Sequence, residues 1–495
     1  MLRRPSTSVF KPLRPFTAQR KLLPALVLSL WAMPAWSADL LTITRDALEN
    51  NAELNSVRSE SQSVEAARDV ARGDLLPQVN ASGNVAHNRQ YESQSSAAGT
   101  QAGQPGAGLG NTAGNDDPFN SVSLTLEASQ ALFDARNSRE VTQAERQIDQ
   151  QVYVLASTEQ QVLIDVATAY FDILRANDIL DARLAQERAI GRQLEQAQEQ
   201  FEVGLIAITE VEEAQASFDQ SRAERIAAQS DLQVSFEVLE RLTGQRYANI
   251  EALSDDYPIA PPTPADRDEW VDLAVQNNPL VLAEQAGVEV SRSGVGIAEA
   301  QRLPTLEAFA NYQYADNDID GIEGYDTSSQ IGLSASWPLY TGGSTQANIR
   351  QSTYQLEASQ YDFEAQRRDT VQQVRSLYTQ VSNDVATVDA REQAIVSNQS
   401  ALDATRAGYE VGTRNIVDVL NAEQNLYNAI SDYAQARYDY VVNLLSLRQQ
   451  AGRLDVEAVE DINAWLQGEE ITFTLPEDSR SSSVTNIGER PELDQ

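Results

Sequence analysis

A glycine-containing apolar turn occurs twice in this 495-residue chain, each time between two very long helical patterns. The first copy spans residues 201–211 (FEVGLIAITEV) and the second spans residues 409–419 (YEVGTRNIVDV). Glycine directly after the last periodic residue is a signal for the end of a helix, and the helical pattern resumes within about five residues. Each copy therefore predicts the tip of a long antiparallel helical hairpin.

The helical patterns that flank the two turns are unusually long. Residues 134–203 contain no proline and carry apolar side chains three and four residues apart, which is typical of a coiled-coil seam. At 1.5 Å per residue such a helix extends for about 100 Å. The return helices end at Gly244 and Gly452, so we predict helical hairpins over residues 134–244 and 341–452.

Four other segments alternate between apolar and polar residues with the period of a half-exposed strand. They occupy residues 77–91, 119–133, 305–315 and 328–340. The two members of each pair are separated by a loop: residues 93–117 are rich in Gly, Ser and Ala, and residues 315–327 are acidic. We therefore predict two β-hairpins.

The whole arrangement repeats. Residues 47–51 match residues 274–278 at an offset of 227, and Val203-Gly204 matches Val411-Gly412 at an offset of 208. A helix precedes each strand pair, over residues 40–75 and 272–302. The predicted organisation is therefore a mainly α fold of two tandem repeats, each a helix, a β-hairpin and a long helical hairpin. The first repeat occupies residues 38–244 and the second occupies residues 271–452, with a linker at 245–270 between them. A C-terminal segment follows at 453–495, with a short helix at 455–466 and a polar tail from 477.

The N-terminus predicts export. Six basic residues precede the apolar run at residues 22–35, which has the length of a signal peptide. We place the cleavage after Ser37, with Ala38 as the alternative, and a retained anchor is the other interpretation. The chain contains no cysteine, which excludes disulfides and a lipid-modified N-terminal cysteine.

The charge of the mature chain restricts its partners. Removing the leader leaves 31 basic and 73 acidic residues, a formal charge of −42, which argues against binding to nucleic acid or anionic lipid. No later segment has the ~18 consecutive apolar residues of a transmembrane helix. In lipid, four strands cannot span as an open sheet, because their edges would leave backbone groups unpaired. The strands must close with copies of the same chain, and dimers, trimers and tetramers all give an even strand number.

The sequence resembles the TolC family of outer-membrane efflux ducts over almost the whole mature chain. The matching segments are residues 409–421 (YEVGTRNIVDVLN), 201–211, 167–171 (ATAYF) and 337–343 (WPLYTGG). The resemblance implies a homotrimer with a 12-stranded β-barrel in outer-membrane lipid, continuous with a 12-helix periplasmic α-barrel. An equatorial domain would be formed by residues 245–270 and the C-terminal segment. It also implies docking on a periplasmic adaptor protein and an RND, ABC or MFS inner-membrane pump. Drugs or proteins would pass through it passively, without cofactor or enzymatic activity.

The resemblance also assigns roles at the two tips. Gate or latch residues would be Thr209, Glu210, Tyr409 and Arg414. The pore constriction would be formed by Asp418 and Asn421, where the family usually has a second aspartate, so a trimer would carry three carboxylates instead of six. Adaptor-contacting residues would be Val203, Gly204, Leu205, Val411, Gly412 and Thr413.

Each role has a simpler structural alternative. Glu210 and Asp418 stand near predicted helix starts, where a carboxylate favours the helix dipole, and Thr209 with Glu212 has the spacing of a capping box. Tyr409 would otherwise be a packing residue. Residues 316–321 begin like a calcium loop, but Thr327 replaces the required glutamate, and the single histidine, His87, offers no metal site. The alternative function is a pore-less periplasmic coiled-coil adaptor or scaffold, although such a protein has no need of four amphipathic strands.

Overall fold

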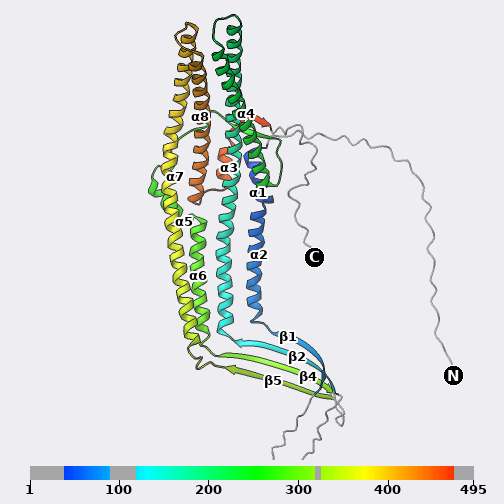
Figure 1. The fold of residues 1–495 in the computed structure, drawn as a ribbon. Coiled ribbons are helices and arrows are strands. Elements are labelled where there is room, and N and C mark those ends of the chain that lie inside the picture. Colours follow the sequence, from blue (N-terminus) through cyan, green and yellow to red (C-terminus); the bar gives the residue numbers. More distant parts are fainter. Residues whose placement is uncertain (1–37, 90–118, 318–324, 473–495) are drawn as a thin grey trace, which may run out of the picture. The chain divides into compact units, whose positions relative to one another are not determined.

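A computed structural model describes residues 38–89, 119–317 and 325–472 (Figure 1). The predicted leader, the loop at 93–117 and the tail from 477 lie outside the described residues. The fold is mainly helical, with two strand pairs and a small second sheet. Among the described residues, no helix combines the length and the apolar character needed to cross a lipid bilayer.

The elements follow one another in the same order in both halves of the chain. The first half consists of α1 (Leu40–Asn50), α2 (Ala52–Gly73), β1 (Gln78–Asn88), β2 (Phe119–Phe133), α3 (Ala135–Glu202) and α4 (Ile208–Thr243). The second half consists of α5 (Arg267–Asn277), α6 (Pro279–Ala300), β4 (Thr305–Asn317), β5 (Tyr325–Ser336), α7 (Ser344–Glu410) and α8 (Ile416–Gln450). Between and after them lie β3 (Asn249–Leu253), α9 (Val456–Asn463) and β6 (Leu466–Thr472).

The helices expected at 40–75 and 272–302 are each broken in two, which corrects the prediction. The breaks fall at Asn51 and Asn278, whose side chains cap the following helices. The Asn51 amide also donates to the carbonyl of Leu242 at 3.0 Å, and the Asn278 amide donates to the carbonyl of Gln450 at 2.9 Å. Each asparagine therefore starts one helix and contacts the end of another, which explains why the chain bends there.

We expect Asn51→Ala to lower the free energy of unfolding by about 1–2 kcal/mol, because it removes a helix cap and leaves a carbonyl without its donor. The neighbouring Asn50→Ala is the control, since Asn50 is exposed. Urea unfolding followed by circular dichroism measures both changes. Equal shifts for the two variants would contradict the capping role.

The strands form one antiparallel sheet in the order β1–β2–β4–β5. Both strands of the second pair extend into the loop expected at 315–327, since β4 ends at Asn317 and β5 begins at Tyr325. The prediction that β5 continues to residue 340 is wrong, because the strand ends at Ser336. Pro338 has no N–H to donate to a neighbouring strand, which accounts for this end.

Two layers of helix packing lead away from the sheet (Figure 1). Near the strands, α2 packs on α3, α3 on α6, and α6 on α7, in the same order as the strands. Beyond α2 and α6, α4 packs on α3, α8 packs on α7, and α3 contacts α8. The strand β3 pairs with β6, which joins the segment between the halves to the C-terminal segment.

The main core lies where α3 meets α8 and β3. Tyr170 and Phe171 of α3 are fully buried, with their ring centroids 5.7 Å apart in an edge-to-face arrangement. The Tyr170 hydroxyl donates to the carbonyl of Glu251 in β3 at 2.6 Å. Arg437 of α8 is also buried and donates to the carbonyls of Leu253 and Ser254. These contacts fix both helical hairpins at the level of the small sheet.

Candidate gate at the helical tips

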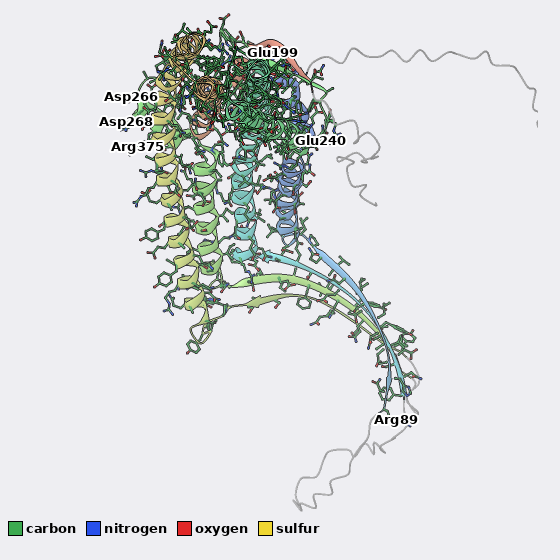
Figure 2. The ribbon with its side chains drawn as sticks, turned by 45° about the horizontal axis from the view of Figure 1, so that its top comes forward. Arg89, Glu199, Glu240, Asp266, Asp268 and Arg375 are labelled. Carbon is green, nitrogen blue, oxygen red and sulfur yellow. The ribbon has the colours of Figure 1, made fainter. Side chains whose placement is uncertain are left out.

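The two predicted tips are exposed turns that end α3 and α7. Figure 2 places Glu199, which lies just before the first tip, at the opposite end of the helices from Arg89, which follows β1. Gly204 and Gly412 have φ angles of 74° and 76°, which a side chain would strain. The Leu205 N–H closes the first turn on the carbonyl of Gln200 at 2.8 Å, and the Thr413 N–H closes the second on that of Gly408 at 2.8 Å.

Both tips expose apolar side chains. Val203, Leu205 and Val411 are 70%, 75% and 75% exposed. Apolar side chains that protrude from a rigid turn favour contact with another protein. Thr413 is exposed beside them, and its hydroxyl donates to the carbonyl of Gly408 at 2.9 Å.

The start of α8 shows that Asp418 has a capping role. Asn415 caps the helix by accepting from the Asp418 N–H at 2.8 Å, and the Asp418 carboxylate accepts from the Asn415 N–H at 3.3 Å. The Arg414 guanidinium lies 3.8 Å from the same carboxylate. Asn421 follows one turn later and is exposed. Asp418 is therefore held in a fixed orientation, and the cap is compatible with a role in a constriction.

The start of α4 differs from the prediction. The helix begins at Ile208, and the N-cap residue is Ala207, which makes no side-chain capping bond. The capping box expected for Thr209 and Glu212 is therefore wrong, because Thr209 already lies inside the first helical turn. Within the described residues, no hydrogen bond or ion pair joins Arg414 to Thr209 or Glu210, so the structure does not bring these predicted gate residues together inside one chain.

Tyr409 connects the two hairpins. Its hydroxyl donates to the Gln200 side-chain oxygen at 2.9 Å, and its side chain packs against a buried apolar cluster of α3, α4 and α8 that includes Leu194 and Ile416. Burial raises the pKa of Tyr409, and the charge of nearby Glu210 adds to the rise, so the hydroxyl remains a donor at neutral pH. The family resemblance indicated Tyr409 but not Gln200, which in sequence looks like an ordinary surface residue of a helix.

Further polar contacts join α3 to α8 away from the tips. The Arg183 guanidinium donates to the Asn428 side chain at 2.9 Å, and the Tyr438 hydroxyl donates to the Asp178 carboxylate at 2.8 Å. Burial raises the pKa of Asp178, whereas the bond from Tyr438 opposes the rise. These pairs could not be predicted from the sequence, because the partners are over 240 residues apart.

Comparison with known proteins identifies the family. The chain matches the family model described as "Outer membrane efflux protein" over residues 43–245 and 270–453. The chain belongs to the outer membrane efflux protein family. Outer membrane protein TolC of Vibrio cholerae is 34% identical over 457 residues, which cover 90% of this chain and 99% of that protein. Alkaline protease secretion protein AprF of Pseudomonas aeruginosa is 31% identical over 438 residues, which cover 87% of this chain and 88% of that protein.

Solved structures share the fold. CusC superimposes with a TM-score of 0.70 and 18% identity, covering 88% of this chain and 99% of that chain. The Campylobacter jejuni CmeC outer membrane channel superimposes with a TM-score of 0.68 and 16% identity, covering 92% of this chain and 98% of that chain. The predicted resemblance is confirmed. This family member is an outer-membrane exit channel of a Gram-negative bacterium, of the kind that serves efflux and type I secretion.

Proposed function

We propose that three copies of this chain assemble into one conduit, with a shared 12-stranded β-barrel continuous with a 12-helix periplasmic tunnel. The observation that carries ring closure is the open edge on both sides of the molecule, and the number of three copies follows the family resemblance. The sheet ends at β1 and β5. The row of helices next to it, in the order α2, α3, α6 and α7, ends at α2 and α7. Because β1 and β5 are antiparallel in the sheet, β5 of one copy can pair with β1 of the next and continue the same pattern.

The exposed side chains at these edges support closure. Val70 on α2 is 70% exposed, and Tyr354 and Tyr361 on α7 are each 68% exposed, which is unusual for residues of this size. On the sheet, Val85 is 76% and Ile331 is 87% exposed. Apolar side chains on the sheet suit contact with lipid, and those on the outer helices suit contact with the next copy.

We further infer that residues 38–244 and 271–452 are tandem structural repeats. The equal order of elements and the equivalent caps Asn51 and Asn278 support this division. An equatorial domain would consist of residues 245–270 and the C-terminal segment, in agreement with the pairing of β3 with β6.

The tips would form the periplasmic entrance. Channels of this family work with an adaptor and an inner-membrane pump, here of the RND, ABC or MFS class, and the exposed Val203, Leu205 and Val411 would contact the adaptor. Arg414 would bond to Thr209 or Glu210 of a neighbouring copy, since it does not do so within its own chain. Asp418 and Asn421 would line the constriction. Drugs or proteins would then pass from the pump to the exterior in one step.

Cross-linking and conductance test the conduit. The chain has no cysteine, so Val70→Cys with Tyr354→Cys introduces the only thiols, one on each outer helix. Oxidation in outer membranes is expected to give a ladder that ends at three copies, and the purified protein should conduct in planar bilayers. A ladder that ends elsewhere contradicts the trimer. A soluble protein without conductance would favour the alternative, a pore-less periplasmic adaptor.

Asn421→Asp is expected to strengthen block by divalent cations about tenfold, because it adds three carboxylates beside the three of Asp418 in a trimer. Conversely, the native channel should be blocked less tightly than a relative with two aspartates. Single-channel conductance with cations titrated from the periplasmic side measures the half-blocking concentration. Asn425→Asp adds the same charge one turn further along α8, where the side chain is also exposed, and serves as the control. Equal effects of the two changes would contradict a ring at residue 421.

A further inference from the structure

Four large side chains form a stripe along the sheet-proximal half of α7, which we call the α7 stripe. Tyr354, Tyr361, Arg368 and Arg375 are all exposed and follow one another at intervals of seven residues. An interval of seven keeps side chains on one face of a helix and is the pattern of a seam with a neighbouring helix. Figure 2 shows Arg375 at the side of the molecule where α7 ends the row of helices. The α7 stripe is therefore aromatic near the sheet and basic further from it.

The basic end of the α7 stripe is unusual in a chain whose formal net charge is −36. A groove of about 640 Å³ along α7 is lined by four arginines, Arg267, Arg367, Arg368 and Arg375, and by one carboxylate, Glu364. Glu364 binds Arg367 at 3.1 Å and Arg368 at 2.8 Å, whereas Arg375 has no ion-pair partner in the described part of the chain. The groove therefore keeps a positive charge, which suits carboxylates.

The opposite end of the helix row carries a complementary set of side chains. Ser56, Ser63 and Val70 of α2 are exposed and are also seven residues apart. Glu49, at the end of α1, continues the same interval and is exposed, and Glu53 is exposed one turn later. This α1–α2 edge therefore has small or apolar side chains near the sheet and carboxylates further from it.

The carboxylates of the α1–α2 edge have no countercharge of their own. Neither Glu49 nor Glu53 forms an ion pair with another described residue, since the bridges from α2 to α3 are made by arginines. Burial raises the pKa of Asp165 in α3 and the charge of Glu53 adds to the rise, whereas a bond from Gln161 and the charge of Arg241 oppose it. A second cation beside Glu53 would therefore stabilise both carboxylates.

The two edges lie at matching heights. Three contacts between neighbouring helices fix the relative heights of α2, α3, α6 and α7: Asn137 with Asp74, Gln143 with Gly294, and Asn348 with Gln301. The helix α2 runs toward the sheet and α7 runs away from it, so each step of seven along one is matched by a step of seven along the other. Rotation of one copy onto the next in a closed ring preserves height. Tyr354 of one copy therefore lies level with Val70 of the next, and Arg375 with Glu49, to within about one turn.

We propose that the α7 stripe is the surface on which the α1–α2 edge of the next copy packs, with its arginines bonded to the carboxylates of that edge. The pairs are Tyr354 with Val70, Tyr361 with Ser63, Arg368 with Glu53 and Arg375 with Glu49. The inference rests on the proposed conduit, because it names the contact that joins its copies. Copies that each carry a large negative charge repel one another, and the arginines reverse this locally. They also fix which height of α7 meets α2, and thereby the register in which β5 meets β1.

The spacing of the side chains favours a second copy over any other acidic partner. Such a partner would need the arginines alone, and nothing would place the tyrosines at the same interval of seven residues. The matching interval on α2, with serines opposite the large side chains, leaves room for them as holes leave room for knobs between packed helices.

Arg375→Glu tests the charge pairing, because it places two carboxylates opposite each other. We expect the full-length protein in detergent to need an at least about tenfold higher concentration for half-assembly, since a trimer contains this contact three times. Glu49→Arg should have a similar effect, and the double variant Arg375→Glu with Glu49→Arg should return to within about threefold of the wild type. Gln373→Glu is the control, because it adds a carboxylate at nearly the same height on another exposed face of α7. Mass photometry over a dilution series measures all four variants.

Cross-linking tests the register without a change of charge. The chain has no cysteine, so Tyr361→Cys with Ser63→Cys introduces the only thiols. Oxidation is expected to join neighbouring copies. Tyr361→Cys with Ser56→Cys is the matched control, since Ser56 is equally exposed but lies one interval of seven, about 10 Å, further along α2, beyond the reach of a disulfide.

Two results would overturn the inference even if the protein forms a conducting trimer. One is a cross-link at Ser56 in place of Ser63, which would mean a different register. The other is assembly that Arg375→Glu leaves unchanged, which would mean that the arginines serve a different acidic partner. A wild type that stays monomeric and does not conduct would instead contradict the conduit itself, so the two failures are distinguishable.

Discussion

Phe171→Ala is expected to lower the free energy of unfolding by about 3–5 kcal/mol, the range for deletion of a buried aromatic ring. Phe171 is fully buried in α3, between Tyr170 at 5.7 Å and Tyr438 of α8 at 6.3 Å, measured between ring centroids. The cavity would form where two helices and a strand meet, so neither α3 nor α8 can close it alone. A loss of this size is a large part of the stability of a typical domain.

Phe201→Ala is the matched control, because it deletes the same ring from the end of the same helix. Phe201 is 41% exposed at the first tip, so we expect a loss of about 1 kcal/mol or less. Urea unfolding of the detergent-solubilised full chain, followed by circular dichroism, compares the two midpoints. Similar midpoints would show that the core around Phe171 rearranges to fill the space.

The Phe171 region also bears on the gate. Tyr170 and Tyr438, its two neighbours, donate hydrogen bonds to Glu251 and Asp178. These bonds connect α3 to β3 and to α8, so they set the point from which both hairpins extend to the tips. We therefore expect Phe171→Ala to loosen the contact of Tyr409 with Gln200 as well, although that contact lies many turns away along α3.

The sequence predicted the features that depend on local periodicity. Long helical patterns predicted α3 and α7, and alternation between apolar and polar residues predicted the four strands of the large sheet. The breaks at Asn51 and Asn278 were missed, although the Asn-Asn pair occurs at both positions, because an asparagine inside an apolar pattern is compatible with a continuous helix. The strands β3 and β6 were missed because each is short and pairs with a partner more than 200 residues away, which no local pattern reveals.

The same limit applies to the tips. Family resemblance located Tyr409 and Asp418, and the turn glycines marked where the helices end. The resemblance did not reveal Gln200, since a polar residue on a long helix has the same appearance in sequence whether water or another helix covers it. The contact of Gln200 with Tyr409 depends on how α3 and α7 are placed side by side, and that placement is a property of the tertiary structure.

Gly452→Ala is expected to be destabilising for two separate reasons. Gly452 has a φ of 68°, a left-handed conformation that costs a residue with a side chain about 1–2 kcal/mol. In addition, a Cβ at this position would lie 2.3 Å from the carbonyl oxygen of Asn277 at the end of α5. Backbone cannot rotate away as a side chain can, so α8 and α5 would have to separate, at a further cost of about 1–3 kcal/mol.

Gly412→Ala separates these two costs. Gly412 has a similar φ of 76°, but no atom lies within 4 Å of the added Cβ, so only the conformational strain of about 1–2 kcal/mol applies. Comparison of the two urea midpoints therefore isolates the contact between Gly452 and Asn277. Equal midpoints would mean that the end of α8 shifts without loss, which is difficult to reconcile with the bond from Asn278 to Gln450 beside it. A larger shift for Gly452→Ala would show that this junction holds the inner hairpin at its base.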